Sequence, residues 1–216
     1  MSRVFLAGST GYVGRALSAA LVARGHSVDA LCRPGSEARL AAGVKPVRGN
    51  VLDSSTYVSA LRPDHVVVHL VGTPKPAPWK ADQFERVDVG SVTQLLRAVV
   101  AHPVSHIVYM SVAHPAPVMR AYVNARIRAE AALHTADCPL TILRPWYVLG
   151  AGHRWAYALL PVYWLAERNA SFREGALRLG FVTLEQMVTA LVASVESAGA
   201  DLRILDVPAI RAARLT

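Results

Sequence analysis

The sequence contains few cysteines, and those it has form no recognisable cluster. Its 216 residues include only two, Cys32 and Cys138, and no CxxC or His/Cys pattern is present. Two thiols cannot make a disulfide framework, and the missing clusters argue against a zinc site. We therefore expect a protein kept in a reducing, cytoplasmic setting, with no bound metal.

Long apolar segments are also missing. The first residues, MSRVFLAGSTGYVG, lead straight into a strand and a glycine loop, without the apolar segment and cleavage site of a signal peptide. The nearest candidate, residues 155–166, has about a dozen residues and contains Pro161, whereas a spanning helix needs roughly 20. We expect no integral membrane segment, and we interpret residues 155–166 as a buried or substrate-covering helix rather than a membrane-surface helix.

Charged residues make up only 18% of the chain, and acidic ones are the scarcer kind. The 23 Lys and Arg residues exceed the 15 Asp and Glu residues, which gives a formal net charge of +8. The basic residues are scattered arginines rather than runs, so we expect no nucleic-acid binding. The excess positive charge would attract a phosphorylated cofactor or an acidic substrate, unless it only reflects an arginine-rich proteome. The hydrophobic fraction of 53% excludes a disordered chain.

Short apolar runs alternate with segments of helical periodicity along the chain. We predict strands at residues 3–7, 27–32, 44–48, 65–71, 106–110, 140–143 and 203–207. We predict helices at residues 12–24, from 36 to near 43, from 54 or 55 to before 63, about 81–101, 120–135, and from a capping box at 183–186 to about 196.

This alternation predicts an α/β fold: a Rossmann-type, doubly wound parallel sheet with helices on both faces. We expect one domain over residues 1–216, with a small C-terminal substrate-covering region at about 146–182. Right-handed crossovers place ligands at the carboxyl ends of the strands.

A glycine-rich loop joins the first predicted strand to the first predicted helix. Its first glycine allows a tight turn, the second allows close approach to a diphosphate, and the third allows the helix to pack against the strand. The helix N-terminus adds unpaired N–H groups and partial positive charge. We therefore predict a dinucleotide site, rather than a glycine turn without a ligand, at Gly8, Ser9, Thr10, Gly11, Tyr12, Val13 and Gly14.

Arg33 stands just past the second predicted strand, where an NAD-specific site has an acidic residue for the ribose 2′-hydroxyl. An arginine there suits a 2′-phosphate instead. Asp29 lies within the strand, too early to replace it. We predict NADP(H) rather than NAD(H) as the cofactor; the alternative is a surface arginine at a strand end.

With these residues assembled, the chain resembles the short-chain dehydrogenase/reductase superfamily, most closely its atypical and extended branch of NmrA-like and NAD-dependent epimerase/dehydratase-like proteins. The GxxGxxG spacing is the form of that branch, and residues 49–53 are similar to its G-D-x-x-D. The resemblance implies that Asp53 contacts the adenine. It also implies cofactor-lining roles for Leu70, Val71 and Gly72, and for Pro145 and Val148 near the nicotinamide end.

The family's catalytic set is a serine at the end of the fifth strand and Tyr-x-x-x-Lys on the next helix. Ser111 and Tyr122 stand in the first two places, but the lysine position is Arg126. Asp88 stands where the family usually has asparagine. Because Tyr122 and Arg126 share a helix face, both can reach the cofactor ribose and a substrate carbonyl. Arginine keeps the charge of lysine, but its planar fork places the donors differently.

Several roles stay open at this point. The Tyr122 hydroxyl either transfers a proton or positions the cofactor, or the side chain only covers a helix face. The Ser111 hydroxyl either donates a hydrogen bond to a substrate or bonds to the main chain. Two functions fit these roles. The first is an NADPH-dependent oxidoreductase acting on a small carbonyl or quinone-like molecule, and the second is a non-catalytic NADP(H)-binding redox sensor or assembly protein. A nucleic-acid or anionic-membrane binder rests on net charge alone. The resemblance also implies a homodimer.

Overall fold

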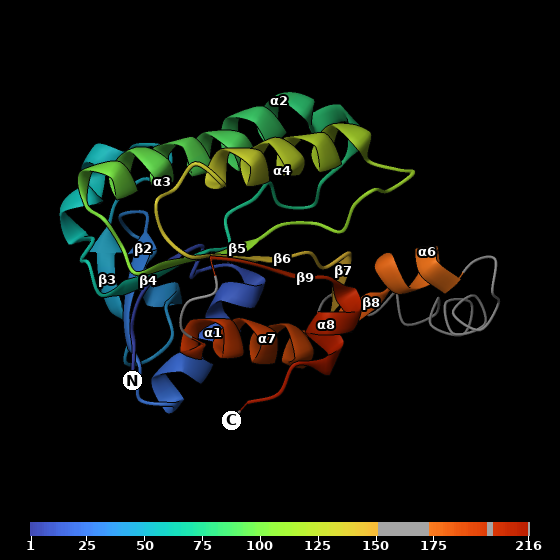
Figure 1. The fold of residues 1–216 in the computed structure, drawn as a ribbon. Helices are drawn as coiled ribbons and strands as arrows, with labels where there is room; N and C mark the ends of the chain where they lie inside the picture. The colour runs from blue at the N-terminus through green and yellow to red at the C-terminus, as the bar shows by residue number, and fades with distance from the viewer. Residues whose placement is uncertain (151–172, 198–200, 216) are drawn as a thin grey trace.

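The computed structural model describes residues 1–150, 173–197 and 201–215. Its centre is a sheet of seven parallel strands in the order β3-β2-β1-β4-β5-β6-β9 (Figure 1). The strands are β1 (Arg3–Ala7), β2 (Ser27–Cys32), β3 (Lys45–Arg48), β4 (His65–His69), β5 (His106–Met110), β6 (Leu140–Leu143) and β9 (Leu202–Leu205).

Helices cover both faces of this sheet, as Figure 1 shows. One face carries α1 (Tyr12–Ala23), α7 (Leu184–Glu196) and α8 (Val207–Ala212). The other carries α4 (Arg120–Leu133) and one continuous run made of α2 (Ala81–Gln83), the π-helical turn η5 (Phe84–Val89) and α3 (Gly90–Ala101). The predicted doubly wound α/β fold is therefore confirmed.

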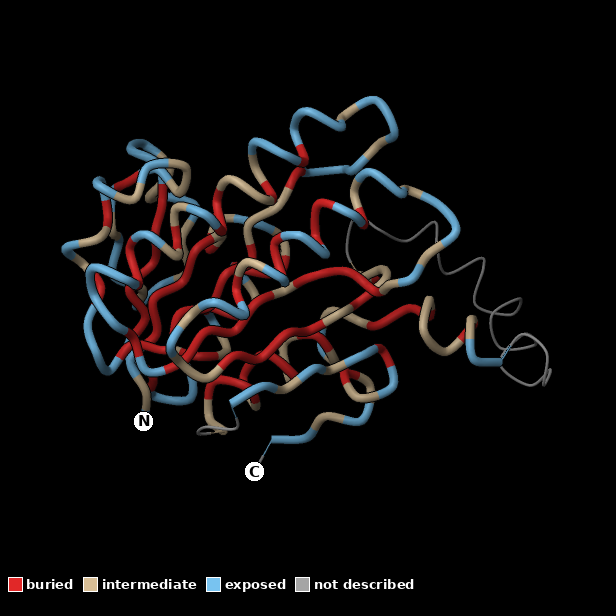
Figure 2. Tube along the Cα trace, turned by 45° about the horizontal axis from the view of Figure 1, so that its top comes forward, coloured by how far each residue is buried: buried red, intermediate tan, exposed pale blue. Residues whose placement is uncertain are grey.

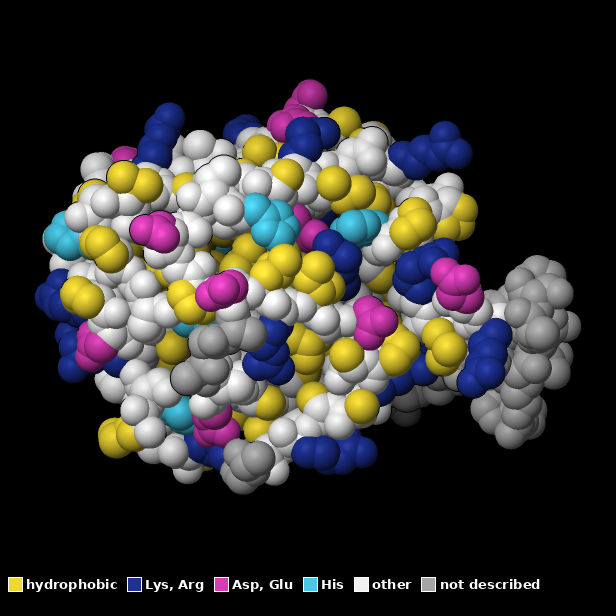
Figure 3. All heavy atoms as spheres, in the orientation of Figure 1, with side chains coloured by type: hydrophobic (Ala, Val, Ile, Leu, Met, Phe, Trp, Pro, Cys, Tyr) yellow, Lys and Arg dark blue, Asp and Glu magenta, His cyan; other side chains and the backbone are white. Residues whose placement is uncertain are grey.

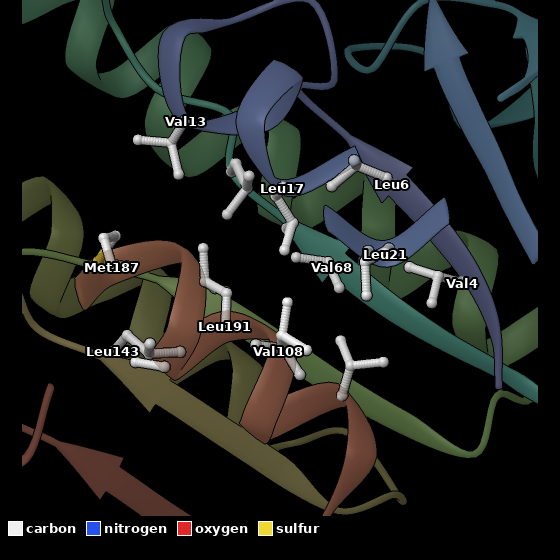
Figure 4. Packing of buried hydrophobic residues seen from close by; sticks show 14 of the residues in the cluster. Val4, Leu6, Val13, Leu17, Leu21, Val68, Val108, Leu143, Met187 and Leu191 are labelled. Atoms are coloured by element: carbon white, nitrogen blue, oxygen red, sulfur yellow. The ribbon is translucent and has the colours of Figure 1, made fainter. Parts of the chain in front are cut away.

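Each strand contributes side chains to both faces, because successive residues of a strand point in opposite directions. Val4 and Leu6 belong to the core on the α1 and α7 side, whereas Phe5 belongs to the core on the α3 and α4 side. In Figure 4, side chains of α1 and α7 meet those of the central strands, and in Figure 2 these strands are almost wholly buried. Burial on both faces explains why the central strands β1, β4, β5 and β6 are nearly continuous apolar runs.

Two of the predicted helices are wrong. Residues 36–43 form only a single 3-10 turn, η1 (Glu37–Arg39), which contains no buried residue. A segment this short is not stable as a helix without an apolar face to bury. Residues 54–62 form two 3-10 turns, η2 (Ser54–Thr56) and η3 (Val58–Ala60), because the Asp53 and Thr56 side chains bond to nearby main chain.

The C-terminal part contains elements that the sequence analysis did not predict. Strands β7 (Tyr147–Leu149) and β8 (Phe181–Thr183) form a separate parallel pair, and a short helix, α6 (Arg173–Arg178), precedes β8. The last strand ends at Leu205 rather than residue 207, because Asp206 caps α8 and a proline follows at its start. The helix predicted at residues 155–166 lies outside the described residues.

The start of α7 follows its sequence signature. Thr183 accepts from the main-chain N–H of Gln186, and the Gln186 side chain accepts from the N–H of Thr183. This capping box satisfies two donors that a helix otherwise leaves unpaired. Among the described residues, no helix has the length and apolar character to cross a membrane. On the face seen in Figure 3, Lys and Arg side chains are spread out rather than gathered into one patch.

Candidate functional site

A cleft of about 450 Å³ opens at the carboxyl ends of β1, β2 and β4. This is where the strand order reverses direction, and such a switch point is the usual ligand position in an open α/β sheet. The cleft is lined by residues of the glycine loop, of the β2 and β3 ends, and of the β4 end: Gly8, Thr10, Gly11, Leu31, Cys32, Arg33, Arg39, Gly49, Asn50, Val51, Leu52, Leu70, Val71, Gly72, Pro74 and Val87.

The glycines of the loop are required by its geometry. Gly8 has a φ of +94°, in the region that side chains disfavour, and a Cβ there would also crowd the main chain of Leu70. A Cβ on Gly14 would overlap the carbonyl oxygen of Gly8. That oxygen accepts from the N–H of Gly11 at 3.0 Å, which closes the turn. The loop therefore depends on glycine for both its turn and its contact with α1.

The N-terminus of α1 is suited to an anion. No side chain caps this helix, and no acidic residue stands in its first turn. The main-chain N–H groups of Val13 and Gly14 belong to the first turn, which has no intrahelical acceptors. These amides and the helix dipole lie beside the cleft lining of Gly8, Thr10 and Gly11, an arrangement that fits a diphosphate.

The other loop residues have different surroundings. Ser9 is fully buried, and its hydroxyl donates to the carbonyl oxygen of Leu31 at 3.3 Å, which ties the loop to β2. The Val13 side chain belongs to the core. The Tyr12 hydroxyl lies against Gly150, leaving no room for a Cβ there. The side chains of Ser9 and Val13 thus hold the loop in place, and a ligand would meet their main chain.

Two arginines stand at the β2 end of the cleft. Arg33 and Arg39 both line it and are both exposed. Arg39 also donates to the carbonyl oxygen of Thr10 at 3.2 Å, so its guanidinium lies beside the glycine loop. The sequence analysis missed Arg39 because it lies in the β2–β3 crossover, where no motif marks it.

In the segment after β3, the neighbours of the predicted residue Asp53 line the cleft, but Asp53 itself does not. The lining neighbours are Asn50, Val51 and Leu52. The Asp53 carboxylate accepts from the main-chain N–H of Ser55 at 3.1 Å and from its hydroxyl at 2.7 Å. A contact between Asp53 and an adenine stays a prediction.

At the β4 end, Leu70, Val71 and Gly72 line the cleft, and their contact with a cofactor stays a prediction. Arg126 lies directly behind this segment: it donates to the carbonyl oxygen of Val71 at 3.2 Å, and a Cβ on Gly72 would overlap its guanidinium. Gly72 therefore separates the cleft from a buried cation.

Arg126 is 3% exposed and is held by an extended set of partners. Its Nη1 donates to the Tyr109 hydroxyl at 2.9 Å and to the carbonyl oxygen of Met110 at 3.1 Å, and its Nη2 pairs with Oδ1 of Asp88 at 2.9 Å. Burial alone lowers the pKa of Arg126, but Tyr109, Tyr122 and Asp88 raise it, so the net pKa lies above the ordinary value. The guanidinium stays charged.

Asp88 is equally enclosed. It is fully buried, and its Oδ2 accepts from the Thr73 main-chain N–H at 3.1 Å and from the Thr73 hydroxyl at 2.6 Å. The two positions that depart from the family pattern, Asp88 and Arg126, thus form one buried ion pair. The sequence analysis identified both departures but not their pairing, which depends on folding.

The other expected catalytic residues lie on the α4 side of the sheet. Ser111 is 4% exposed, and within the described part of the chain its hydroxyl has no hydrogen-bond partner. Tyr122 is half-buried, with its ring 5.2 Å from that of Phe84 and 5.4 Å from the Arg126 guanidinium carbon. Neither residue lines the cleft, but Arg126 contacts the neighbours of both Gly72 and Ser111.

Pro145 and Val148 do not line the cleft either. Pro145 is buried and its carbonyl oxygen accepts from the N–H of Ala113 at 2.9 Å, next to the β5 end. Val148 lies in β7 and packs against the core. Their contact with a nicotinamide stays a prediction.

Three buried strand histidines each have a polar side chain beside the ring. His69 bonds Ser91 at 3.0 Å, His106 bonds Thr141 at 2.9 Å, and His65 lies 3.2 Å from Asp29. Burial, with a smaller effect of Arg126, lowers the pKa of His69 to about 3, so its ring is neutral. Within the described ranges, no three His, Cys, Asp or Glu side chains are grouped as a metal site requires.

The glycine loop, the N-terminus of α1 and the cleft at the switch point define an NAD(P)-binding Rossmann site. A family model described as NAD(P)H-binding matches residues 8–157, well over half of the chain. The chain belongs to this NAD(P)H-binding family.

Two curated relatives match most of the chain. A 4-hydroxy-2-methyl-3-oxo-4-farnesyl-3,4-dihydroquinoline-1-oxide ketoreductase of Stigmatella aurantiaca is 28% identical over 79% of this chain and 57% of its own length. A 2-alkyl-3-oxoalkanoate reductase of Stenotrophomonas maltophilia (strain K279a) is 28% identical over 82% of this chain and 58% of its own length. The chain therefore spans less than two thirds of these relatives.

Solved structures show the same fold. A short-chain dehydrogenase/reductase superfamily protein from Agrobacterium tumefaciens with bound NAD has a TM-score of 0.68 at 20% identity, covering 97% of this chain and 80% of its own. MoeE5 in complex with UDP-glucuronic acid and NAD has a TM-score of 0.72 at 20% identity, covering 95% and 76%.

Proposed function

We propose that this protein is an NADPH-dependent reductase of a small carbonyl or quinone-like substrate. The observation that carries the proposal is the buried hydroxyl of Ser111, which has no hydrogen-bond partner among the described residues and lies at the end of β5, on the α4 side of the sheet where Tyr122 lies. A buried hydroxyl without a partner is costly, which favours a ligand that accepts its hydrogen bond. The two curated relatives, a ketoreductase and a 3-oxoalkanoate reductase, support the same chemistry.

The protein's own groups would bind and protonate the substrate. Bound NADPH supplies the hydride. Ser111 donates a hydrogen bond to the carbonyl oxygen and orients it, and Tyr122 gives up the proton that this oxygen takes when the carbonyl is reduced to an alcohol. Arg126 has its Nη donors committed to Asp88, Tyr109 and main-chain oxygens, so it acts on Tyr122 through the ring contact.

The substitution Tyr122→Phe tests this role. We expect it to lower the turnover of NADPH with 3-oxoacid and cyclic ketone substrates by at least about 100-fold, because the proton donor is lost. The affinity for NADPH should change by less than about threefold, since the hydroxyl is outside the cleft. The matched control is Tyr57→Phe, which removes a buried hydroxyl elsewhere and should keep activity. Full activity in Tyr122→Phe would remove Tyr122 from the mechanism.

We also propose that the cofactor is NADP(H) rather than NAD(H). Arg33 and Arg39 stand together at the β2 end of the cleft, and neither has an acidic partner among the described residues. The acidic neighbour Glu37 is instead bound to Arg48 at 2.6 Å. Two unneutralised guanidinium groups at this end suit a 2′-phosphate and leave no acidic residue for a ribose 2′-hydroxyl.

Alanine substitutions of these arginines give a direct measure of cofactor preference. We expect Arg33→Ala and Arg39→Ala each to weaken NADPH binding about tenfold, which corresponds to about 1.4 kcal/mol. Binding of NADH should change by less than about threefold, because NADH lacks the phosphate. Arg97→Ala, on the exposed face of α3, gives the same change in net charge without touching the cleft. Calorimetry of these three variants and the parent protein with both cofactors checks this, and an equal loss for NADPH and NADH would contradict it.

A second candidate, a non-catalytic NADP(H)-binding sensor, rests on the Asp88–Arg126 pair. Arg126, at the lysine position of Tyr-x-x-x-Lys, is bound to Asp88, and its positive charge is therefore less able to promote proton transfer by Tyr122. Cofactor binding without turnover on any carbonyl substrate would favour this reading.

A further inference from the structure

The buried pair beneath the cleft is electrically balanced. Arg126 and Asp88 have side chains 4% and 0% exposed, and their charged atoms are 2.9 Å apart. Among the described residues, the side chains that bond to the pair from outside it are neutral: Tyr109 and Thr73 bond to it directly, and His69, also neutral, stacks on Tyr109 with ring centroids 5.9 Å apart. The charge on either member is therefore compensated chiefly by the other.

This pair lies within one residue of the cleft. Gly72 lines the cleft and has no room for a Cβ because the Arg126 guanidinium occupies that space. Val71, the next lining residue, accepts a hydrogen bond from the same guanidinium. The guanidinium contacts these two lining residues directly, with no room for water between them. An unbalanced charge on it would therefore act strongly on a group bound at the β4 end of the cleft.

The β4 end is also the end of the cleft opposite the arginines. Arg33 and Arg39 stand at the β2 end and the glycine loop lies between the two ends. A dinucleotide whose 2′-phosphate lies at the arginines and whose diphosphate lies at the loop extends its nicotinamide half toward Gly72. The nicotinamide ring is cationic in NADP⁺ and neutral in NADPH, so charge beneath this end distinguishes the two forms.

We propose that Asp88 neutralises Arg126 so that the protein can bind NADP⁺ nearly as well as NADPH, and that the pair thereby sets the relative affinity for the oxidised and reduced cofactor. This inference rests on the proposed NADP(H) site. It assigns Asp88 a positioning and charge-balancing role rather than a catalytic one, since Asp88 does not line the cleft.

The ratio of two dissociation constants tests the proposal without any turnover measurement. We expect Asp88→Asn, which keeps the shape of the side chain and removes its charge, to raise the Kd for NADP⁺ relative to that for NADPH by at least about fivefold. Arg126→Met removes the cation instead and should not raise the ratio, because no unbalanced positive charge then remains beneath the cleft. The double variant D88N/R126M, which has neither charge, should return to the parent ratio.

Further variants separate charge from structure. The double variant D88N/R126K has the same charge as D88N, with the residue types of the family pattern, and should raise the ratio even if D88N does not fold. Ser194→Ala removes a buried hydroxyl on α7, far from the cleft, and should leave the ratio unchanged. If D88N and D88N/R126K weaken both cofactor forms equally, the charge-balancing role is wrong. If the parent protein binds neither form, the proposed cofactor site fails instead.

Discussion

Gly14→Ala is expected to weaken NADPH binding by at least about 100-fold, a loss of about 2.7 kcal/mol. The added Cβ would overlap the carbonyl oxygen of Gly8, which is main chain and has no rotamer to relieve the contact. The loop must then open, and the hydrogen bond from Gly11 to Gly8 is lost. Calorimetry with NADPH, on protein shown to be folded by circular dichroism, measures the loss.

Gly175→Ala is the matched control for this substitution. Gly175 lies in α6, and among the described residues no atom outside its chain neighbours and its own helix backbone is within 4 Å of the position a Cβ would take. Alanine there should leave cofactor affinity unchanged and favour the helix slightly. If Gly14→Ala bound NADPH as tightly as the control, the loop would not be the diphosphate site.

Arg126→Met is expected to lower the free energy of unfolding by about 3–5 kcal/mol, because it leaves the buried Asp88 carboxylate without its cation. It also removes the hydrogen bonds to Val71, Tyr109 and Met110, which join the carboxyl ends of β4 and β5. Urea denaturation followed by circular dichroism gives the difference in unfolding free energy.

Arg128→Met, two residues further along α4, is the comparison. Arg128 pairs with Glu85, but both side chains are more than half exposed, at 51% and 57%. Exposed ion pairs contribute about 1 kcal/mol at most, so this substitution should cost little. A loss below about 1 kcal/mol for Arg126→Met as well would show that the ion pair contributes little to stability.

The sheet and the long helices were predictable because their apolar residues recur with a clear period. The helices predicted at residues 36–43 and 54–62 failed because periodicity alone does not show whether a segment has a face to bury. Asp53 and Thr56 bond instead to nearby main chain, which stabilises 3-10 turns. Asp206 and the proline after Val207 are a signature of the start of α8, but the sequence analysis assigned residues 206 and 207 to the preceding strand.

The glycine loop was predictable because its chemistry depends on main chain, which the residue types constrain directly. The Arg126 environment was not, since its partners come from β4, η5 and β5, far apart in the sequence. The resemblance to Tyr-x-x-x-Lys placed Arg126 on the correct helix face, but it could not show that the Asp88 carboxylate lies beside its guanidinium. Arg39 could not be identified either, because its position depends on how the β2–β3 crossover folds back to Thr10.

Strands β7 and β8 pair with each other outside the seven-stranded sheet. Tyr147 lies opposite Phe181, and their rings meet edge to face with centroids 6.0 Å apart. A chimaera that exchanges the chain between these two strands is therefore expected to keep the seven-stranded sheet and the glycine loop unchanged.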